Sequence, residues 1–587
     1  MEEDFPSLPE ECWELIFNFL LHPRHTHHFE SLSLVCKQFF SITNKLRTTL
    51  RISNLTIPAI PRIYSRFLNL KRIDLSHFNG LLDGLLLGIA QSGLDIESLD
   101  ISNQKTIPVH DLMVFGSAMQ NLRVLLCSKI KLLPDEHLVV IGKAFPNLEE
   151  LDISYPTNVL GYHNFVEIEG EVTDSGFLAL VQRLPRLCKV NLSGITFVTD
   201  KSLLALATGC MMLREIVICD CDFITRSGIA QALSQNPNLC SISANWIGMP
   251  SIRSDLIHWF DSLQNLTSLV LYDSNISDEV LNSVANSCLS LKKLVLSRCS
   301  NFSLSGILLL LYKNLPIEWF CLEAAEFLTD ESVKELSEFL PMVKFINLSN
   351  CSNLTCSSLF ILARNCPALT DIYMKNVNLK NEHYTTDFVN NQLMSLDLSE
   401  NKNLCNEGLG KIASSFPNLE LLKLNHCGGI TEEGLGEVLS VCTKIRHLEL
   451  NFCTGIKNIV MKFQLSAMEV LRLRRLVIED STLAMVGRRC PSLIHLDLLG
   501  CSKVTAEGVM EVVRNCRGLR EINIWDCCEI GVSIVPLMVF SRPSLREIVQ
   551  TNSLLSANLK NFFLSHGCVV YDDGSLWDLK GFSENSL

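Results

Sequence analysis

Four histidines near the N-terminus are the residues of this chain best suited to metal chemistry. His22, His25, His27 and His28 crowd one short polar segment. A structural zinc site needs four well-placed ligands and usually includes cysteine, so we interpret this segment as a solvent-exposed loop. The motifs G-x-x-x-x-G-K-[ST], H-E-x-x-H and G-x-S-x-G do not occur in the sequence. We therefore expect neither catalysis nor a metal or cofactor.

The chain has 24 cysteines, and many of them occupy two recurring positions. One set follows short apolar segments: Cys221, Cys299, Cys351, Cys427, Cys453, Cys501 and Cys527. The other set precedes such segments: Cys210, Cys288, Cys366, Cys442, Cys490 and Cys516. Disulfides are typical of small secreted domains, whereas free cysteines of a long intracellular chain behave as small buried hydrophobes. We interpret both sets as reduced thiols of the core.

Aromatic and basic side chains beside the same apolar segments could bind a partner. This set, called the candidate substrate wall, comprises Tyr373, Lys375, Lys423, His426, Phe452, Arg472, Arg474, Arg475 and Trp525. Aromatic and arginine residues dominate binding hot spots, and a basic pocket in an acidic protein favours an acidic or phosphorylated target. The alternative is a solvated face whose basic residues pair with neighbours such as Glu449 and Asp497.

These residues are positioned by a repeating pattern. The pattern Leu-x-x-Leu-x-Leu-x-x-Cys begins at Leu419 and returns, with related apolar residues, at Ile445, Leu493 and Leu519. Anchoring on its first position gives about 19 units, most of them 26 residues apart, a period typical of leucine-rich repeats. Stacked repeats share one continuous core and present an extended binding surface.

Each unit has a strand half and a helix half. The Leu-x-x-Leu-x-Leu half alternates with period two, as a strand with one buried face does. In 432–442, Leu435, Val438, Leu439 and Cys442 follow helical spacing, and Thr431 is a candidate N-cap. We predict an α/β leucine-rich-repeat solenoid of horseshoe shape, with a small all-α module in front.

We predict three segments: a module at 1–50, the solenoid at 51–570 and a C-terminal tail at 571–587. Between the units that begin at Leu148 and Leu187 the spacing rises to 39 residues, which places an insertion near 155–173. Insertions in repeat proteins map to loops and often to the binding side. A tolerated surface loop is an equally good interpretation.

The overall charge limits the possible partners. A net charge of −13 argues against a general nucleic-acid binder or a protein of anionic membranes. The richest apolar stretch, 306–312, is far too short to span a bilayer, and the start of the chain lacks the pattern of a secretory signal. We expect no nucleic acid and no membrane as partner, and a place in the cytoplasm, the nucleus or both.

The first 50 residues do not fit the repeat. Ser7-Leu8-Pro9-Glu10 has the pattern of a helix start with a capping box. Trp13, Ile16, Phe17 and Leu20 then share one helical face, and a second apolar segment covers 32–40. A module of this size cannot bury so much apolar surface alone. It should dock onto the solenoid, onto a partner, or onto both.

This module resembles an F-box. The resemblance rests on Leu8-Pro9-Glu10-Glu11, on Leu15-Ile16-Phe17 with Phe19-Leu20, and on Leu34-Val35-Cys36-Lys37 with Phe39-Phe40. The family usually has tryptophan near position 40, where this chain has phenylalanine. The repeats are similar to the cysteine-containing class of F-box/LRR proteins, as in Cys427-Gly-Gly-Ile-Thr-Glu-Glu-Gly-Leu435.

The resemblance implies the substrate-recognition subunit of an SCF ubiquitin ligase. Its F-box would bind a SKP-type adaptor, and through it cullin and the RING protein, while the solenoid would bind an unknown protein substrate. The residues implied for the adaptor, called the adaptor set, are Leu8, Pro9, Ile16, Leu20, Leu34, Val35, Cys36 and Lys37. We expect about half of these side chains to pack inside the module instead.

Two alternatives remain open from the sequence. In the first, the protein is an interaction scaffold whose module only caps the solenoid, because solenoid ends must be polar or covered. This alternative predicts that the apolar face of the module is buried within the chain. In the second, a small molecule binds within the solenoid, as in plant hormone receptors of this architecture, but the one long insertion is acidic (Glu167, Glu169 and Glu171).

Overall fold

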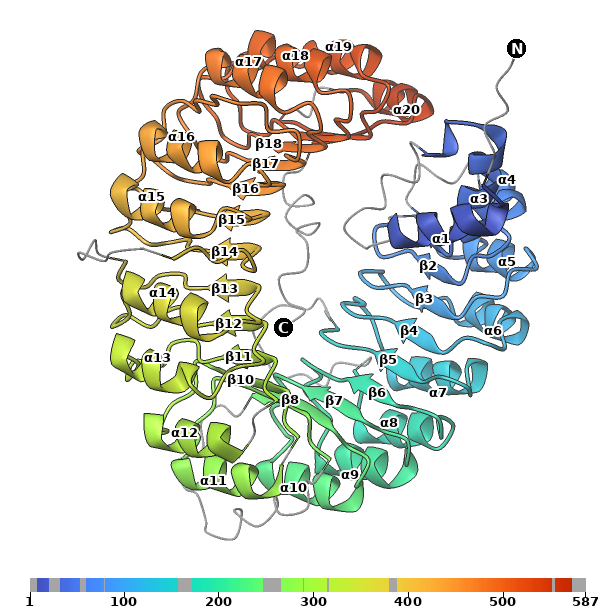
Figure 1. The fold of residues 1–587 in the computed structure, drawn as a ribbon. Coiled ribbons are helices and arrows are strands. Elements are labelled where there is room, and N and C mark those ends of the chain that lie inside the picture. Colours follow the sequence, from blue (N-terminus) through green and yellow to red (C-terminus); the bar gives the residue numbers. More distant parts are fainter. Residues whose placement is uncertain are drawn as a thin grey trace. The chain divides into compact units, whose positions relative to one another are not determined.

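The computed structural model describes residues 8–20, 32–52, 60–78, 80–156, 171–245, 265–288, 290–313, 316–379, 388–551 and 555–572. The chain forms two compact units, Met1–Asn245 with Arg253–Asn265, and Trp246–Ile252 with Leu266–Leu587. Within each unit the strands line one side and the helices the other (Figure 1). We call the sheet face opposite the helices the inner face. No helix among the described residues is both long enough and apolar enough to cross a membrane.

The first unit begins with two helices, α1 (Glu10–Leu20) and α3 (Lys37–Leu46). Phe17 and Ile42 form their buried core, and Trp13 and Phe39 pack against it. The ring centroids of Trp13 and Phe39 lie 4.7 Å apart, edge to face. A small all-α module therefore precedes the sheet.

The rest of the first unit is a run of parallel strands with helices on one face. Its strands are β1 (Thr49–Arg51), β2 (Arg72–Asp74), β3 (Ser98–Asp100), β4 (Val124–Leu126), β5 (Glu150–Asp152), β6 (Lys189–Asn191), β7 (Glu215–Ile218) and β8 (Ser241–Asn245), each paired with the next. Its helices are α4 (Ile60–Arg66), α5 (Leu85–Ala90), α6 (Val109–Ala118), α7 (Asp135–Ala144), α8 (Asp174–Val181), α9 (Asp200–Gly209) and α10 (Arg226–Gln235). The sheet thus starts at Thr49, within the segment predicted as the module.

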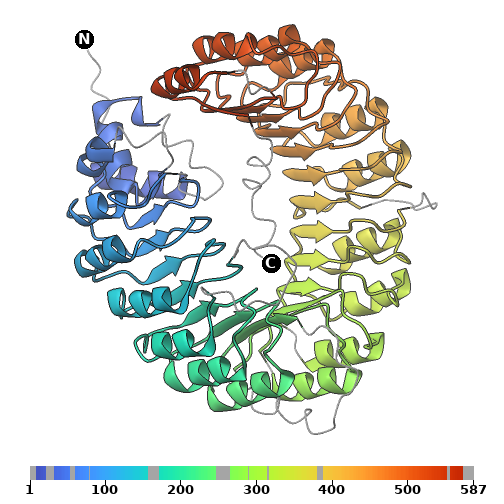
Figure 2. The same ribbon diagram turned by 180° about the vertical axis from the view of Figure 1, so that it is seen from behind.

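The second unit continues the same plan (Figure 2). Its strands are β9 (Ser268–Tyr272), β10 (Lys293–Ser297), β11 (Trp319–Cys321), β12 (Phe345–Asn347), β13 (Asp371–Tyr373), β14 (Ser395–Asp397), β15 (Leu421–Lys423), β16 (His447–Glu449), β17 (Val470–Arg472), β18 (His495–Asp497), β19 (Glu521–Asn523), β20 (Glu547–Val549) and β21 (Val569–Tyr571), each paired in parallel with the next. Its helices are α11 (Asp278–Ser287), α12 (Leu304–Lys313), α13 (Asp330–Ser337), α14 (Cys356–Asn365), α15 (Asn406–Ser415), α16 (Glu432–Val441), α17 (Asp480–Arg489), α18 (Ala506–Asn515), α19 (Ile534–Ser541) and α20 (Ala557–Ser565).

The predicted leucine pattern coincides with this arrangement. Leu419, Leu422 and Leu424 are almost completely buried, and so are the equivalents Leu493, Leu496 and Leu498. Each predicted repeat start precedes a strand, including the two least regular units, at Leu239 and Leu545. The repeat class is therefore confirmed, and the predicted insertion falls between β5 and α8, where 157–170 lie outside the described residues.

The recurring cysteines are buried, free thiols. Cys427 donates a hydrogen bond from Sγ to the carbonyl of Leu398, 29 residues earlier, at 3.2 Å, and Cys501 donates to Leu473 at 3.1 Å. Burial raises the pKa of both thiols to about 12. The interpretation as core thiols is confirmed, and the hydrogen bond gives a reason for cysteine at this position, since it joins each turn to a carbonyl of the preceding repeat.

A second link between repeats is not apparent in the sequence pattern. Thr505, the N-cap of α18, donates from its backbone N at 2.8 Å and from Oγ1 at 2.6 Å to the carboxylate of Asp480, which begins α17. Thr431 is also an N-cap, as predicted, but makes no capping bond to its own helix. Its partner is Asn406, whose amide donates to Thr431 Oγ1 at 2.7 Å. Successive helix starts are thus fastened to one another.

Gly500 lies in a row of left-handed residues that follows the strands, with φ of +70°. Most members of this row are not glycine, so the conformation alone does not require it. A Cβ at Gly500 would, however, lie 2.5 Å from Cδ of Arg475, whose guanidinium reaches Asp526 at 2.7 Å. Glycine therefore leaves room for this ion pair.

Gly500→Ala should therefore destabilise the last repeats by about 1–2 kcal/mol, the cost of a side chain in the left-handed region, together with displacement of Arg475. Urea denaturation followed by circular dichroism would measure the loss. Gly518→Ala is the matched control, because its Cβ would meet only ordinary contacts at 3.7 Å or more. Equal stability of the two variants would contradict this explanation.

Candidate functional site

The candidate substrate wall forms three rows on the second unit. Tyr373, Lys423 and Arg472 end β13, β15 and β17 and share one register position, so they face the inner side. Lys375, Arg474 and Trp525 lie two residues after strand ends, in the turns. His426, Phe452 and Arg475 occupy the left-handed row, with φ of 58–60°. The structure therefore brings the predicted residues to one side of the sheet.

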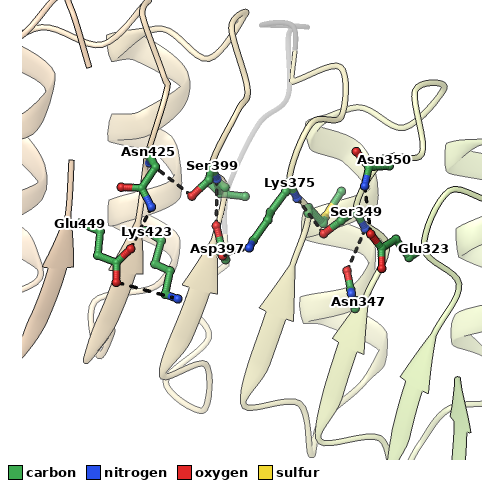
Figure 3. Close-up of polar contacts among 12 residues, drawn as sticks. Glu323, Asn347, Ser349, Asn350, Lys375, Asp397, Ser399, Lys423, Asn425 and Glu449 are labelled. Atoms are coloured by element: carbon green, nitrogen blue, oxygen red, sulfur yellow. Dashed lines mark hydrogen bonds and ion pairs between the residues drawn. The ribbon is translucent and has the colours of Figure 1, made fainter. Parts of the chain in front are cut away.

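The basic residues of the wall are paired with carboxylates. Lys375 Nζ lies 3.3 Å from Asp397, and Lys423 Nζ lies 3.9 Å from Glu449 (Figure 3). Arg472 shares Glu449 at 3.4 Å. Further along, Arg474 and Arg475 contact acidic residues at 2.6 and 2.7 Å, which are Asp497 and Asp526 respectively. This pairing agrees with the alternative interpretation, in which the basic residues of the wall pair with neighbouring carboxylates. The predicted basic pocket is therefore a set of ion pairs.

Glu449 is the centre of this network. Its Oε1 accepts from Nε2 of His447 at 2.8 Å and its Oε2 from the amide of Asn425 at 2.8 Å. Burial alone would raise the pKa of Glu449, but the His447 bond and the charges of Lys423 and Arg472 hold that pKa well below its ordinary value of 4.5. The carboxylate is therefore charged at neutral pH.

Polar side chains at the strand ends form hydrogen bonds with the backbone of the turns that follow the strands. Asp397 Oδ1 accepts from the backbone N of Ser399 at 3.0 Å, and Asn347 Oδ1 accepts in the same way from Ser349 at 2.9 Å (Figure 3). Ser349 Oγ then accepts from the backbone N of Lys375 at 3.1 Å. The recurring Asp/Asn-Leu-Ser sequence is the signal for this device, because a short polar side chain can bond the backbone two residues on.

The left-handed row carries an exposed aromatic pair. His426 and Phe452 stack with ring centroids 4.5 Å apart and planes 7° apart. Phe452 is 41% exposed. Of the aromatic residues predicted for the wall, this pair is accessible for contact, and it lies in the turns beyond the strands.

An aromatic cluster beside the wall was not predicted. Tyr272, Trp319, Phe345 and Tyr373, called the aromatic strip, lie on the inner face of β9 and β11–β13, and only Tyr373 was among the expected residues. Trp319 stacks on Phe345 with centroids 3.9 Å apart, and Phe345 meets Tyr373 edge to face at 4.9 Å. The sequence does contain a signal for this cluster. Strands β9–β11 carry apolar residues at consecutive positions, which is typical of strands buried on both faces.

The adaptor set lies in the N-terminal module. Leu34 is 86% exposed and Val35 is 65% exposed, both in the turn before α3. Ile16 on α1 is 41% exposed. Leu8, Pro9, Cys36 and Lys37 are also exposed, and Leu20 ends α1 with its side chain outside the described residues.

Burial of half of the adaptor set was therefore a wrong expectation. The core of the module is formed instead by Phe17 and Ile42, with Trp13 and Phe39 packed against them. Trp13 and Phe17 therefore lie on the face of α1 that contacts α3. Cys36 has a structural part, since its Sγ accepts from the backbone N of Phe39 at 3.4 Å and caps α3. Sequence reasoning missed Phe19, which is 87% exposed, as a member of the open surface.

The module is fastened to the first helix of the solenoid. Arg66 at the end of α4 lies over the ring of Phe40, 4.3 Å from its centroid, and donates from Nε to Asn44 at 2.8 Å. Asn69 donates to the carbonyl of Lys45 at 2.9 Å. Phe40 thus lies on the side of the module that contacts the solenoid.

No group of three or more histidine, cysteine, aspartate or glutamate residues suited to a metal occurs in the described ranges. His22, His25, His27 and His28 lie outside them, so the loop interpretation is not tested.

The fold is a leucine-rich-repeat solenoid. No family model matches the chain. Solved structures with a similar fold include the complex of Rad7 and Elc1 from yeast, at 18% identity over 62% of this chain and 82% of that one, with a TM-score of 0.42. Mouse RP105 with MD-1 aligns over 82% and 86% at 15% identity and a TM-score of 0.42, and TLR13 with ssRNA13 over 88% and 77% at 17% identity and 0.40. At these TM-scores the assignment rests on the strands and helices of the chain itself.

Proposed function

We propose that the chain is the substrate-recognition subunit of an SCF-type ubiquitin ligase. The α1/α3 module binds a SKP-type adaptor, and the solenoid binds a protein substrate. The observation that carries this proposal is the open apolar surface of the module. The chain itself contributes no catalytic group and acts in the cytoplasm, the nucleus or both.

The open surface is formed by residues on α1 and in the turn before α3. Leu15, Ile16 and Phe19 on α1 are exposed, and so are Leu34 and Val35. Leu15 and Phe19 lie one turn apart on α1, Leu34 and Val35 are adjacent, and grouped exposed apolar residues are typical of a protein interaction site. A module that served only to cap the solenoid would bury it, so this exposure supports the adaptor over the scaffold alternative.

The module and the solenoid offer separate surfaces, as a receptor that binds an adaptor and a substrate requires. The contacts of Arg66 and Asn69 fasten one side of the module to α4 and leave the adaptor set open. A partner held on the solenoid is thereby tethered to whatever the module binds. Tethering raises the effective concentration of the two partners, which accelerates ubiquitin transfer without a catalytic group on this chain.

The proposal is tested by titrating the purified full-length chain with a SKP-type adaptor in a calorimeter. We expect a complex of micromolar or greater affinity, which then recruits cullin and the RING protein on a sizing column. Absence of binding by a chain that circular dichroism shows to be folded would overturn the proposal. The module would then be a solenoid cap and the protein a scaffold.

A further inference from the structure

The outer side of the last two helices differs from that of the preceding repeats. Helix α19 is apolar at every position from Ile534 to Phe540 and contains no charged residue. In α18 the exposed positions are polar instead, as at Glu507, Arg514 and Asn515. A helix that is apolar on all sides is typical of a buried environment, and the end repeats of a solenoid normally have a polar outer face. The composition of α19 therefore fits a helix that is covered on its outer side.

Four exposed side chains on α19 and α20, called the terminal patch, form this apolar surface. They are Leu537, Phe540, Leu559 and Phe562, and they are 43–57% exposed. In each helix the two residues lie three positions apart and so share one face. The ring centroids of Phe540 and Phe562 lie 6.1 Å apart, and the ring of His566 lies 5.5 and 4.5 Å from them. The terminal patch is thus shared by two neighbouring helices (Figure 1).

A basic edge borders the terminal patch at the C-terminal ends of the helices. Arg542, which follows α19, donates from Nε at 2.7 Å to a carbonyl of α18, and Ser544 donates to the carbonyl of Arg517 at 3.0 Å. A Cβ at Gly567, which follows α20, would lie 4.0 Å from Nη1 of Arg546. These contacts place the ends of α18, α19 and α20 side by side, next to the rings of the terminal patch.

The basic edge has an excess of positive charge. Its charged residues are the basic Arg514, Arg517, Arg520, Arg542 and Arg546 and the acidic Glu511, Glu521 and Glu547. Arg514, Arg517 and Arg546 are exposed, and Arg514 lies 3.9 Å from Glu511. Lys560 on α20 is paired with Asp572. In a chain whose net charge is −13, this excess is complementary to acidic residues on an occupant.

The size of the terminal patch indicates a short occupant. A stable interface between folded proteins has about 20–30 residues on each side, and the patch supplies only a small part of that number. A second copy of the chain would also bring a second basic edge to the contact, and the negative net charge opposes binding to an anionic membrane. The two rows of apolar residues, each spaced by one helical turn, match the apolar face of a third helix.

We infer that the terminal patch binds an amphipathic helical segment of a partner protein, whose apolar side chains contact the patch and whose acidic side chains contact the basic edge. This inference goes beyond the proposed function and does not depend on it. It adds a docking surface made of residues that belong neither to the adaptor set nor to the candidate substrate wall.

The inference is tested by selecting peptides from a random library displayed on phage against the immobilised full-length chain. Peptides that also bind the variant Leu537→Asp with Phe540→Asp are removed. We expect a consensus in which two large apolar residues lie about one helical turn apart beside aspartate or glutamate. In fluorescence polarisation the selected peptides should lose roughly 30-fold in affinity for Phe562→Ala, the effect of one aromatic hot spot.

Leu309→Asp with Tyr312→Asp is the matched control, because these exposed apolar residues have the same spacing on α12 of the same unit. This variant should bind the selected peptides with unchanged affinity. Circular dichroism should show that both double variants are folded, since all four replaced side chains are exposed. Failure to select such peptides, wild-type affinity in Phe562→Ala, or an equal loss in the control would overturn the inference.

A charge variant leaves the apolar side chains intact. Arg514→Glu with Arg517→Glu should weaken the same peptides and shift a repeated selection toward basic residues. Unchanged affinity of this variant, or a consensus without acidic residues, would overturn the part assigned to the basic edge.

Three further results would assign the terminal patch to another occupant and overturn the assignment to a partner protein. The first is a consensus that matches residues 573–587, which lie outside the described residues, together with tighter peptide binding by a chain that lacks them. The second is a dimer on a sizing column that dissociates in the variant Leu537→Asp with Phe540→Asp. The third is sedimentation of the wild type, but not of this variant, with vesicles of anionic phospholipid.

Discussion

Leu34→Asp combined with Val35→Asp is expected to abolish adaptor binding while the chain remains folded. Each wild-type side chain that is buried on binding contributes roughly 1.5–3 kcal/mol, and each aspartate would instead lose its hydration without a counter-charge. Loss of the two apolar contributions alone corresponds to a weakening of about 100-fold to more than 10,000-fold. A micromolar complex would no longer be detected by calorimetry.

The fold should tolerate this change because both side chains face solvent. Neither belongs to the module core of Phe17 and Ile42. The melting temperature should therefore stay close to the wild-type value. The matched control is Leu81→Asp with Met342→Asp, two exposed apolar residues of the solenoid at 78% and 52% exposure. Equal loss of binding in the control, or retained binding in the module variant, would show that these residues do not contact the adaptor.

Glu449→Gln is expected to destabilise the second unit strongly although it alters only one charge. The variant keeps the shape of the side chain but removes the charge that faces Lys423 and Arg472, whose side chains are 7% and 15% exposed. Removing one partner of a buried ion pair costs about 3 kcal/mol or more. Denaturant unfolding should show the loss first in the repeats around β15–β17, because each repeat contacts only its neighbours.

The charge of Glu449 also gives the effect a pH dependence. Its pKa is lowered from 4.5, so its contribution is complete above that value and decreases as the pH falls below it. The wild-type and variant unfolding curves should therefore converge in acid. Glu318→Gln is the matched control, since Glu318 forms an exposed pair with Lys344 and exposed pairs contribute little. Equal stability of wild type and Glu449→Gln at neutral pH would contradict the central place of this carboxylate.

The ion pairs of the candidate substrate wall have a structural role on the inner face. The pairs of Lys375, Arg472 and Arg474 join neighbouring strands and fix the register of the sheet. Breaking them to bind an anion would leave a buried carboxylate without its partner.

The repeat and its core could be predicted from the sequence. The alternation around Leu422 and the helical spacing from Leu435 to Cys442 are local patterns, and their period sets which residues face the helices. The buried cysteines follow from the same period. The first helix of the N-terminal module was also predicted, whereas the second predicted apolar segment, 32–40, overlaps only the start of α3.

Only the tertiary structure decided which surfaces are open. The sequence gives the side of a strand on which Lys423 lies, but its partner Glu449 is 26 residues away and is brought near by the stacking of repeats. In the module, Phe17 and Ile16 are adjacent and both apolar, and the position of α3 determines that Phe17 is buried and Ile16 exposed. Likewise Trp319, Phe345 and Tyr373 become one aromatic cluster only through strand register. Period is a local property of the chain, whereas exposure and pairing depend on contacts between repeats.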